Sequence, residues 1–293
     1  MMSVSDGFKT LIKRIQTTDA EIDKFNKHAE VITNVLKKAF SLQTVKNHGS
    51  HSRGTAIRKY SDLDLFCVVS KEDFKWGDSL MSSNTVLSKF KDALVERYTQ
   101  SAIGRDGQAI VLNFFDGTKI DVIPAVFKNI NQYKKPTYLI PDGDFGWLET
   151  TPETYTSIIK DVHEASGYKF SYVIQLLKYW RECRTPRIPI LSFHIEYTFA
   201  ILQTFSEVKS YAECLYDAFD LLYSRKCAAL RDPLSISGLI PIACTESQKE
   251  QIYAALSSAR DKVARAINAE YKGNNETACN YWNLIFNGGF PAL

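Results

Sequence analysis

Two aspartates separated by one residue, Asp62 and Asp64, stand in an apolar stretch that follows a Gly-Ser pair, Gly49 and Ser50. In an extended strand alternate side chains share one face, so both carboxylates should point to the same spot, with Cα atoms roughly 6.6 Å apart. Carboxylates held this close repel each other unless a cation lies between them. Oxygen ligands suit magnesium or manganese better than zinc. The pair therefore predicts a site for a divalent metal ion.

A third carboxylate comes from a separate strand-like stretch, "TKIDVIP", in which Asp121 is flanked by Ile120 and Val122. These two apolar neighbours should face the core, which leaves the carboxylate on the opposite face. In a two-metal site one ion activates an attacking hydroxyl and the other neutralises a leaving pyrophosphate. The sequence therefore predicts three catalytic acids, Asp62, Asp64 and Asp121, that hold two Mg²⁺ (or Mn²⁺) ions for phosphoryl or nucleotidyl transfer.

The Gly-Ser pair upstream of the acids has a chemistry of its own. Glycine lets the backbone approach phosphate oxygens, while a serine hydroxyl and successive N–H groups donate to them. We expect Gly49 and Ser50 to bind substrate phosphates. A Gly-Ser loop alone is commonly a turn, and an Asp-x-Asp alone is commonly a solvated strand edge. Their order along the chain, with eleven residues between Ser50 and Asp62 and a later strand-borne acid, favours catalysis over both.

The elements that must position these residues follow from periodicity. A helical spacing of apolar residues and a capping box at Thr18–Glu21 predict that the chain begins with helices. Short stretches rich in β-branched and aromatic residues predict strands at 43–48, 63–69, 108–115 and 118–127. Helical patterns take over at 157–181, 192–208, 210–224 and 246–271. The sequence therefore predicts a mixed α and β half, residues 1–150, and an all-helical half, residues 151–293.

Composition excludes several classes of protein. The chain has 293 residues, of which 45% are apolar and 24% charged, as is ordinary for a folded domain. A net charge of +3 is too small to indicate a surface dedicated to long polyanions. Six cysteines occur without a C-x-x-C pair or zinc-ligand spacing, which is typical of reduced thiols. Without an export signal or a long apolar run, we expect a cytoplasmic protein with no membrane partner.

At these residues the sequence resembles the polymerase-β-like nucleotidyltransferases, whose pattern is Gly-Gly/Ser, about ten residues, and Asp-apolar-Asp/Glu, with a later third acid. More closely, "GSHSRGTAIRKYSDLDLFCVV" is similar to the cGAS/DncV-like nucleotidyltransferases (CD-NTases) of bacterial antiphage signalling. The segment "VIQLLKYWRECRTPRIPILSFHIE" is similar to the helical lobe of that family, and "AINAEYKGNNETACNYWNLIFNGGFP" to its closing helix. The resemblance spans roughly residues 45–291.

The resemblance implies an α+β fold, with a polymerase-β-like nucleotidyltransferase core and N-terminal helices in residues 1–150 and a helical substrate-binding lobe in residues 151–293. It implies an enzyme that joins NTPs into a cyclic di- or trinucleotide second messenger and releases pyrophosphate, in bacterial antiphage (CBASS) signalling. By position, Lys178 and Ser192 would contact substrate phosphates, together with Gly49 and Ser50. Asp121 would lie nearest the attacking ribose hydroxyl and help to deprotonate it.

The expected partners are NTP substrates and a downstream effector protein that the cyclic nucleotide activates. We expect no nucleic-acid activator. The animal cyclic GMP-AMP synthase of this family has a zinc-binding insertion, and this chain lacks the His and Cys cluster that would form it. Two other functions use the same acids and stay open: a linear nucleotide-adding transferase of the oligoadenylate or RNA-tailing type, and a catalytically silent NTP-binding module. The sequence does not fix the NTPs, the ring size, the linkages, the activating signal or the oligomeric state.

Overall fold

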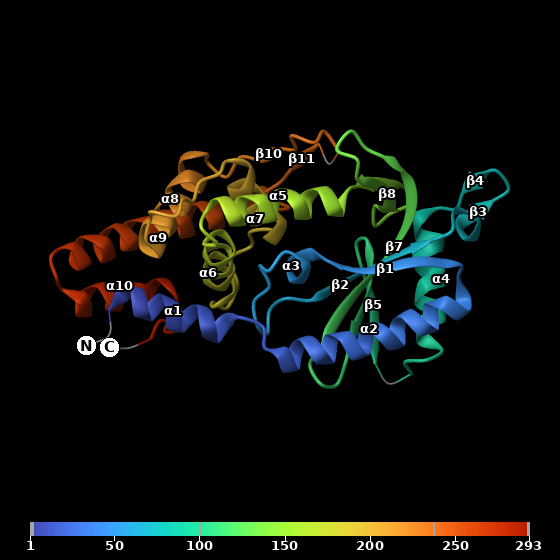
Figure 1. Cartoon of the computed structure of the whole chain (residues 1–293), viewed down its shortest axis with the longest axis horizontal. Helices are drawn as coiled ribbons and strands as arrows, with labels where there is room; N and C mark the ends of the chain where they lie inside the picture. Colours follow the sequence, from blue (N-terminus) through green and yellow to red (C-terminus); the bar gives the residue numbers. More distant parts are fainter. Residues whose placement is uncertain (1–2, 100, 237, 292–293) are drawn as a thin grey trace. The chain divides into compact units, whose positions relative to one another are not determined.

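The computed structural model describes residues 3–99, 101–236 and 238–291, and they divide into two compact units. The sheet unit comprises Thr17–Gly54 and Ser61–Thr156. The helical unit comprises residues 3–16 and 55–60 and the described residues from Ser157 onward. Both are drawn in Figure 1. Among the described residues, no helix combines the length and the apolar character that crossing a membrane requires.

The sheet unit carries most of the strands. Its elements in chain order are α2 (Asp19–Ala39), β1 (Leu42–His48), α3 (Gly49–Ser52), β2 (Leu63–Val69), the 3₁₀ turn η1 (Lys71–Phe74), β3 (Lys75–Trp76), β4 (Ser79–Leu80), α4 (Ser83–Val95), β5 (Ala102–Asp106), β6 (Ala109–Asn113), β7 (Lys119–Ile130), β8 (Pro136–Pro141), β9 (Trp147–Thr150) and the start of α5 (Pro152–Ala165).

The helical unit is built from helices with one short strand pair. Its elements are α1 (Val4–Ile15), most of α5, α6 (Phe170–Glu182), α7 (Ser192–Ile201), α8 (Tyr211–Ser224), β10 (Leu230–Arg231), β11 (Leu239–Ile240), α9 (Glu246–Tyr271) and α10 (Asn275–Ile285). Together the two units confirm the predicted α+β class, a central sheet accompanied by many helices.

The main sheet runs in the order β1-β2-β7-β6-β5, and β8 pairs with both β7 and β9. Strands β2 and β7 are parallel to each other, whereas the other pairs are antiparallel. On one face, apolar side chains of β2 and β7, such as Leu65 and Val122, pack in one core with Ile32 and Leu36 of α2 and with α4. Because side chains alternate along a strand, the residues between them lie on the opposite face.

The strands predicted at 108–115 and 118–127 form a hairpin before Asp121, since β6 and β7 pair antiparallel through Asn113 and Lys119. Its loop is longer than the two-residue turn that the Asp-Gly dipeptide indicates, because the Phe114 and Thr118 backbones still bond to each other. Gly117 has a φ of +83°, so it supplies the left-handed residue that closes a three-residue loop.

Two strands of the main sheet, β8 and β9, were absent from the prediction because their sequence is rich in chain breakers. β8 begins and ends with proline, and β9 follows a loop that holds two glycines. Proline is tolerated at the first residue of a strand, so Pro136 can open β8 although β8 pairs on both sides. The glycines and prolines of this region indicated a loop, whereas the region forms two further strands of the sheet. β5 and the two-residue strands β3, β4, β10 and β11 were also not predicted. The prediction of an all-helical half over residues 151–293 is therefore wrong at β10 and β11, which pair with each other.

The predicted helix over residues 157–181 is wrong, because two helices, α5 and α6, occupy this region. Gly167 and Tyr168 separate them with φ values of +61° and +62°, which no α-helix accommodates. The helix predicted over 192–208 ends earlier, at Ile201. The helices predicted at 210–224 and 246–271 match α8 and α9 closely.

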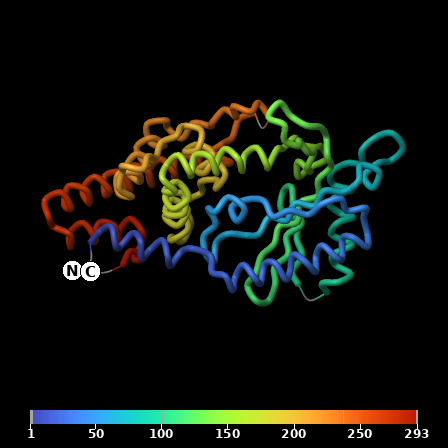
Figure 2. Tube along the Cα trace, in the orientation of Figure 1, coloured from blue at the N-terminus to red at the C-terminus, as the bar shows by residue number. Residues whose placement is uncertain are grey.

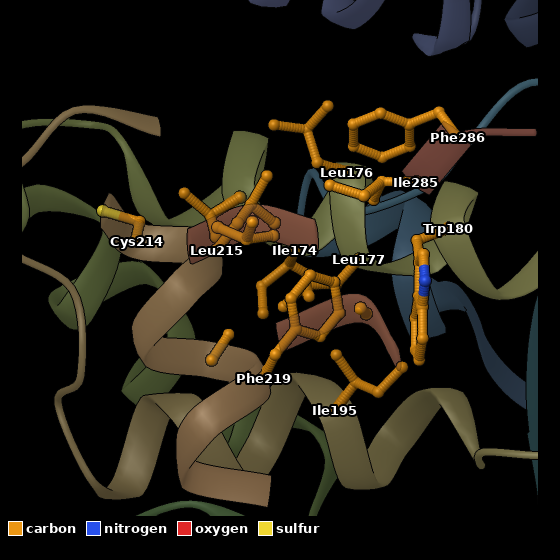
Figure 3. Packing of buried hydrophobic residues seen from close by; sticks show 14 of the residues in the cluster. Ile174, Leu176, Leu177, Trp180, Ile195, Cys214, Leu215, Phe219, Ile285 and Phe286 are labelled. Carbon is orange, nitrogen blue, oxygen red and sulfur yellow. The ribbon is translucent and has the colours of Figure 1, made fainter. Parts of the chain in front are cut away.

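The helical unit has one large apolar core, part of which is drawn in Figure 3. Trp180 of α6 packs against Phe219 of α8 with ring centroids 4.8 Å apart. α9 and α10 lie side by side in the trace of Figure 2. Helix α1 joins this core through Phe8, whose ring is 4.7 Å from that of Trp282.

The packing of α1 explains why the units differ from a single division at residue 150. The apolar face of α1 is buried with the helices of the C-terminal half, so residues 3–16 belong to the helical unit. Residues 55–60 belong to the same unit. The outermost residues of the two predicted halves, 1–2 and 292–293, lie outside the described residues.

Candidate active site

The three predicted acids meet on one face of the sheet unit. Asp64 of β2 and Asp121 of β7 are direct partners in the parallel register, one between Leu63 and Leu65 and the other between Ile120 and Val122. The flanking apolar residues pack into the core beneath α2 and α4, so the two carboxylates project from the opposite face. Asp62 immediately precedes β2 and shares this face by alternation.

A lysine that the prediction did not include, Lys119, lies among these acids. Its Nζ is 2.5 Å from Oδ2 of Asp62, a charge-assisted hydrogen bond, and 3.9 Å from Oδ1 of Asp121. Lys119 opens β7 two residues before Asp121, so their side chains share a face. Three carboxylates, one just before β2, one in β2 and one in β7, form a compact charged group with one ammonium. We call this group the acid cluster: Asp62, Asp64, Asp121 and Lys119.

The side chain of Asp121 is only 20% exposed. Burial raises the pKa of its carboxyl to about 6, and the Lys119 ammonium opposes this rise while the Asp62 charge adds to it. Its Oδ1 is buried and has no hydrogen-bond partner among the described residues. A buried carboxylate oxygen without a hydrogen-bond donor raises the free energy of the folded state. Binding of a cation or a proton to this oxygen would lower that free energy.

Gly49 brings the backbone against the acid cluster. It starts α3 with a φ of +70°, in the left-handed region where glycine is favoured. A Cβ built at Gly49 would overlap the carboxylate of Asp64. Only glycine therefore allows this approach, and Ser50 follows it directly within the four-residue helix α3. The Gly-Ser pair thus lies beside an acid of the cluster, as its spacing in the sequence predicts.

His48 completes the row of residues across the sheet. It ends β1 opposite Asp64, its ring packs edge-on against Phe66 at 5.0 Å, and its Nε2 lies 4.0 Å from Oε1 of Glu153. Burial lowers the pKa of the His48 imidazole to about 4, although the Glu153 carboxylate opposes the shift. The imidazole is therefore neutral at pH 7 and leaves the charge of the acid cluster unchanged.

The acid cluster offers the donor atoms that a divalent cation prefers, but these atoms are not already arranged as a coordination shell. Its donors are carboxylate oxygens, which suit Mg²⁺ and Mn²⁺, and one of them, Oδ1 of Asp121, has no hydrogen-bond partner in the described part of the chain. Lys119 shows that a positive group is already stabilised between Asp62 and Asp121. Across residues 3–99, 101–236 and 238–291, no three His, Cys, Asp or Glu side chains are already arranged as a metal site.

Lys178 lies in the helical unit and is buried, with its side chain 3% exposed. Its Nζ donates to Oε1 of Glu196 at 2.5 Å and to the carbonyl and hydroxyl oxygens of Thr55 at 3.1 and 3.3 Å. Phosphate contact by this ammonium therefore requires that it exchange a buried carboxylate partner. Neither Glu196 nor this pairing follows from local sequence, because the partners are 18 residues apart on different helices.

Ser192, the first residue of α7, is also in the helical unit. Its Oγ accepts a hydrogen bond of 2.5 Å from Nη1 of Arg181, which donates as well to the carbonyl of Ile190 at 2.9 Å. Arg181 further pairs with Glu182. The structure thus gathers Asp62, Asp64, Asp121, Gly49 and Ser50 in the sheet unit, and it places Lys178 and Ser192 in the helical unit.

Lys119 was missed although a signal for it exists. In "TKIDVIP" the lysine stands two residues before Asp121, and the period of a strand puts such residues on one face. The same rule that joined Asp62 to Asp64 would therefore have placed an ammonium beside the third acid.

Comparison with known proteins gives the family. Residues 2–162 match the family described as Second Messenger Oligonucleotide or Dinucleotide Synthetase domain. A probable cyclic nucleotide synthase of Bacillus cereus is 24% identical over 286 residues, covering 87% of this chain and 84% of that protein. A cyclic AMP-AMP-AMP synthase of Escherichia coli is 22% identical over 312 residues, covering 94% of each.

A solved structure agrees at the level of the fold. The structure of Escherichia coli CdnC with ATP superposes with a TM-score of 0.75 at 20% identity, covering 98% of each chain. The family match covers more than half of this chain and includes all three acids and the Gly-Ser pair. The chain therefore belongs to the Second Messenger Oligonucleotide or Dinucleotide Synthetase family, the cGAS/DncV-like nucleotidyltransferases, and is a nucleotidyltransferase of the cyclic nucleotide synthase type.

Proposed function

We propose that this enzyme joins NTPs into a cyclic di- or trinucleotide in a reaction that depends on Mg²⁺ or Mn²⁺ and releases pyrophosphate. One observation carries the proposal: Asp64 and Asp121 are register partners on adjacent parallel strands, on the same face as Asp62 and against the backbone of Gly49. Membership in a family of second-messenger synthetases supports the cyclic product. The similarity to a cyclic AMP-AMP-AMP synthase supports ATP as one substrate and a trinucleotide as one possible ring.

The acid cluster would hold the divalent cations through Asp62, Asp64 and Asp121. When bound, such cations lower the pKa of an attacking hydroxyl and stabilise the charge on a leaving pyrophosphate. The chain supplies the oxygen ligands on rigid strands, so their separation is fixed by the sheet rather than by loops.

Asp121 has a second role in the proposal. Its Oδ1 is buried and has no donor among the described residues, so it is the carboxylate oxygen best prepared to accept a proton. We assign to this atom the proton of the attacking ribose hydroxyl. Asp62, which already accepts a hydrogen bond from Lys119, is less suited to that step.

The Gly-Ser pair would hold donor phosphates beside the acids. Gly49 lets the backbone approach the Asp64 carboxylate closely, and Ser50 adds a hydroxyl one residue later. Phosphate contacts by Lys178 and Ser192 stay predictions from the family resemblance. For Lys178 such a contact competes with Glu196, and for Ser192 it competes with, or is shared by, the guanidinium of Arg181.

The biological role follows from the proposed product. A cyclic oligonucleotide acts by binding a receptor, so a downstream effector protein is the expected partner, and bacterial antiphage (CBASS) signalling is the proposed setting. We place the proposed reaction in the cytoplasm, where NTPs are available. The six cysteines are free in the structure, in keeping with a reducing compartment.

The test is incubation of the purified protein with the four NTPs and Mg²⁺ or Mn²⁺, followed by phosphatase treatment and mass spectrometry. We expect a phosphatase-resistant product with the mass of a cyclic nucleotide, and pyrophosphate in step with it. The Asp62→Asn/Asp64→Asn variant keeps the shape of both side chains. Its activity should fall by about 10³-fold or more, because each substitution removes a negative charge and replaces one carboxylate oxygen with an amide nitrogen that cannot bind a metal ion.

Other products of the same assay decide against the proposal. A phosphatase-sensitive oligomer that keeps a 5′-triphosphate identifies a linear nucleotide-adding transferase. NTP binding without pyrophosphate identifies a silent module. Equal turnover by the wild type and the double Asn variant means that the acids are not the catalytic centre.

A further inference from the structure

Lys119 is the one member of the acid cluster whose charge opposes a metal. Its ammonium is bonded to Oδ2 of Asp62 at 2.5 Å and lies 3.9 Å from Oδ1 of Asp121. Both oxygens belong to carboxylates that the proposed function assigns to the divalent cations. A ligand oxygen cannot face an ammonium and a metal ion at close range together, since two cations a few ångströms apart repel strongly.

The cluster needs a counter-ion when no metal is present. Three carboxylates share one face of two adjacent strands, and the Lys119 ammonium lies 2.5 Å from an oxygen of Asp62 and 3.9 Å from an oxygen of Asp121. Like charges at this separation disfavour each other's ionised form, and a fixed cation between them relieves the repulsion. Lys119 lies on the same strand as Asp121, so the fold itself places a positive charge that reduces the repulsion between the carboxylates.

The lysine is also free to move. Its side chain is 35% exposed, and that of Asp62 is 34% exposed, so solvent reaches both partners. A lysine side chain has a long flexible stem, and an ion pair of this exposure holds its geometry weakly. Rotation about the side-chain bonds takes the ammonium off Asp62 without movement of β7.

We propose that Lys119 is a resident counter-ion of the acid cluster, which neutralises Asp62 and Asp121 in the metal-free enzyme and leaves these carboxylates when a metal-bound nucleotide enters. The inference rests on the proposed function, because it takes these carboxylates to be metal ligands. It explains why the described residues contain no preformed metal site although three acids meet. The enzyme then holds divalent metal weakly until nucleotide phosphates supply negative charge of their own.

The experiment measures Mn²⁺ binding to the full chain without nucleotide, from the spectrum of free Mn²⁺ in electron paramagnetic resonance. Lys119→Met removes the charge and keeps the length of the side chain. We expect its Kd for Mn²⁺ to be about tenfold lower than that of the wild type, because one charge within about 4–6 Å shifts the pKa of a carboxyl group by about one to three units and Mn²⁺ competes for the same oxygens. Lys119→Arg keeps the charge and should bind Mn²⁺ as weakly as the wild type.

Two controls tie the gain to the cluster. Lys128 stands on the same strand and pairs with Glu149 at a comparable exposure, so Lys128→Met removes a similar ion pair away from the acids and should leave Mn²⁺ affinity unchanged. Adding Asp62→Asn/Asp64→Asn to Lys119→Met should abolish the gain. Melting curves of each variant verify that it is folded.

The outcomes separate the two proposals. Unchanged or weaker Mn²⁺ binding by folded Lys119→Met, while the wild type converts NTPs to product, overturns the counter-ion role and leaves the function intact. Tighter binding that survives the Asn substitutions also overturns it. Absence of Mn²⁺ binding in the wild type and Lys119→Met alike, together with absence of product, overturns the proposed function and the counter-ion role with it.

Discussion

Each unit of the molecule contains a lysine bonded to a carboxylate at 2.5 Å, and the two pairs have different surroundings. In the sheet unit, the Lys119 and Asp62 side chains are 35% and 34% exposed, and further carboxylates stand nearby. In the helical unit, the Lys178 and Glu196 side chains are 3% and 1% exposed, and Thr55 accepts two more hydrogen bonds.

The difference indicates what each pair can do. A buried charge is tolerated only with its partner, so Lys178 and Glu196 depend on each other and hold the surrounding helices. An exposed pair contributes little to stability and exchanges its partners readily. The same two functional groups therefore serve as structure in one unit and, in our proposal, as an exchangeable counter-ion in the other.

The largest expected effect is the removal of one partner of the buried pair. Lys178→Met removes the ammonium that is bonded to the buried Glu196 carboxylate, which should lower the free energy of unfolding by about 3–5 kcal/mol. Urea denaturation followed by circular dichroism measures it. The double variant Lys178→Met/Glu196→Gln removes both charges and should recover a large part of the loss. A loss below about 1 kcal/mol for the single variant would show that the pair is hydrated and would remove the contrast between the units.

Acid should destabilise both units through one buried histidine in each. Burial lowers the pKa of His194 to about 4, with the Arg225 charge adding to the shift and the Ile240 carbonyl opposing it, and the pKa of His48 is also about 4. The ordinary value is 6.5, so the unfolded chain binds more protons between pH 6.5 and pH 4. Stability is therefore complete above pH 6.5 and falls as the pH drops toward 4, by up to about 3 kcal/mol per histidine.

Asparagine at position 194 separates this effect from general acid denaturation. The His194 Nδ1 lies 3.1 Å from the Ile240 carbonyl oxygen, and an Asn amide can donate to the same oxygen without titrating. We expect the melting temperature of His194→Asn to change less between pH 6.5 and pH 4.5 than that of the wild type. Parallel curves for the two proteins would show that His194 does not titrate in this range.

A smaller loss of stability is expected for Gly49→Ala. Alanine at a φ of +70° costs about 1–2 kcal/mol, and the new Cβ must also displace the Asp64 carboxylate. Gly77 has a φ of +63° and open space around its Cα, so Gly77→Ala is the matched control for the backbone cost alone. Nucleotide turnover should fall in Gly49→Ala and stay unchanged in Gly77→Ala. Equal turnover in both variants would mean that the approach of Gly49 to Asp64 has no part in catalysis.

The smallest effect on stability is expected where the pair is exposed. Lys119→Met should change the free energy of unfolding by no more than about 1 kcal/mol, because solvent screens the pair. Thermal melting at low and high salt measures it beside Lys178→Met. A loss as large as that of Lys178→Met would make Lys119 a structural residue and would count against its exchange for a metal.

The sequence predicted what depends on local periodicity. Alternation along β2 and β7 placed Leu65 and Val122 in the core and the three acids on the other face, and the capping box at Thr18 starts α2 as expected. Partners that are far apart in the chain escaped it. Glu196 meets Lys178 only through the packing of α6 and α7.

Prolines and glycines accounted for several of the remaining errors. The prolines at both ends of β8 indicated a loop, yet Pro136 is the first residue of a strand, a position where proline is tolerated. The apolar pattern of α5 and α6 looked continuous, because periodicity does not register the positive φ of Gly167. Lys119 was within reach of the alternation rule, but its charge was not weighed against the acid two residues later.

The most direct measurement is the anomalous scattering of Mn²⁺ in crystals of the full chain grown with Mn²⁺ and a non-hydrolysable ATP analogue. We predict a Mn²⁺ peak at about 2.0–2.2 Å from carboxylate oxygens of Asp62 and Asp64, with the Lys119 ammonium no longer bonded to Asp62. Bound nucleotide with Mn²⁺ away from these carboxylates, and with Lys119 still on Asp62, would contradict the assignment of the acid cluster as the catalytic centre.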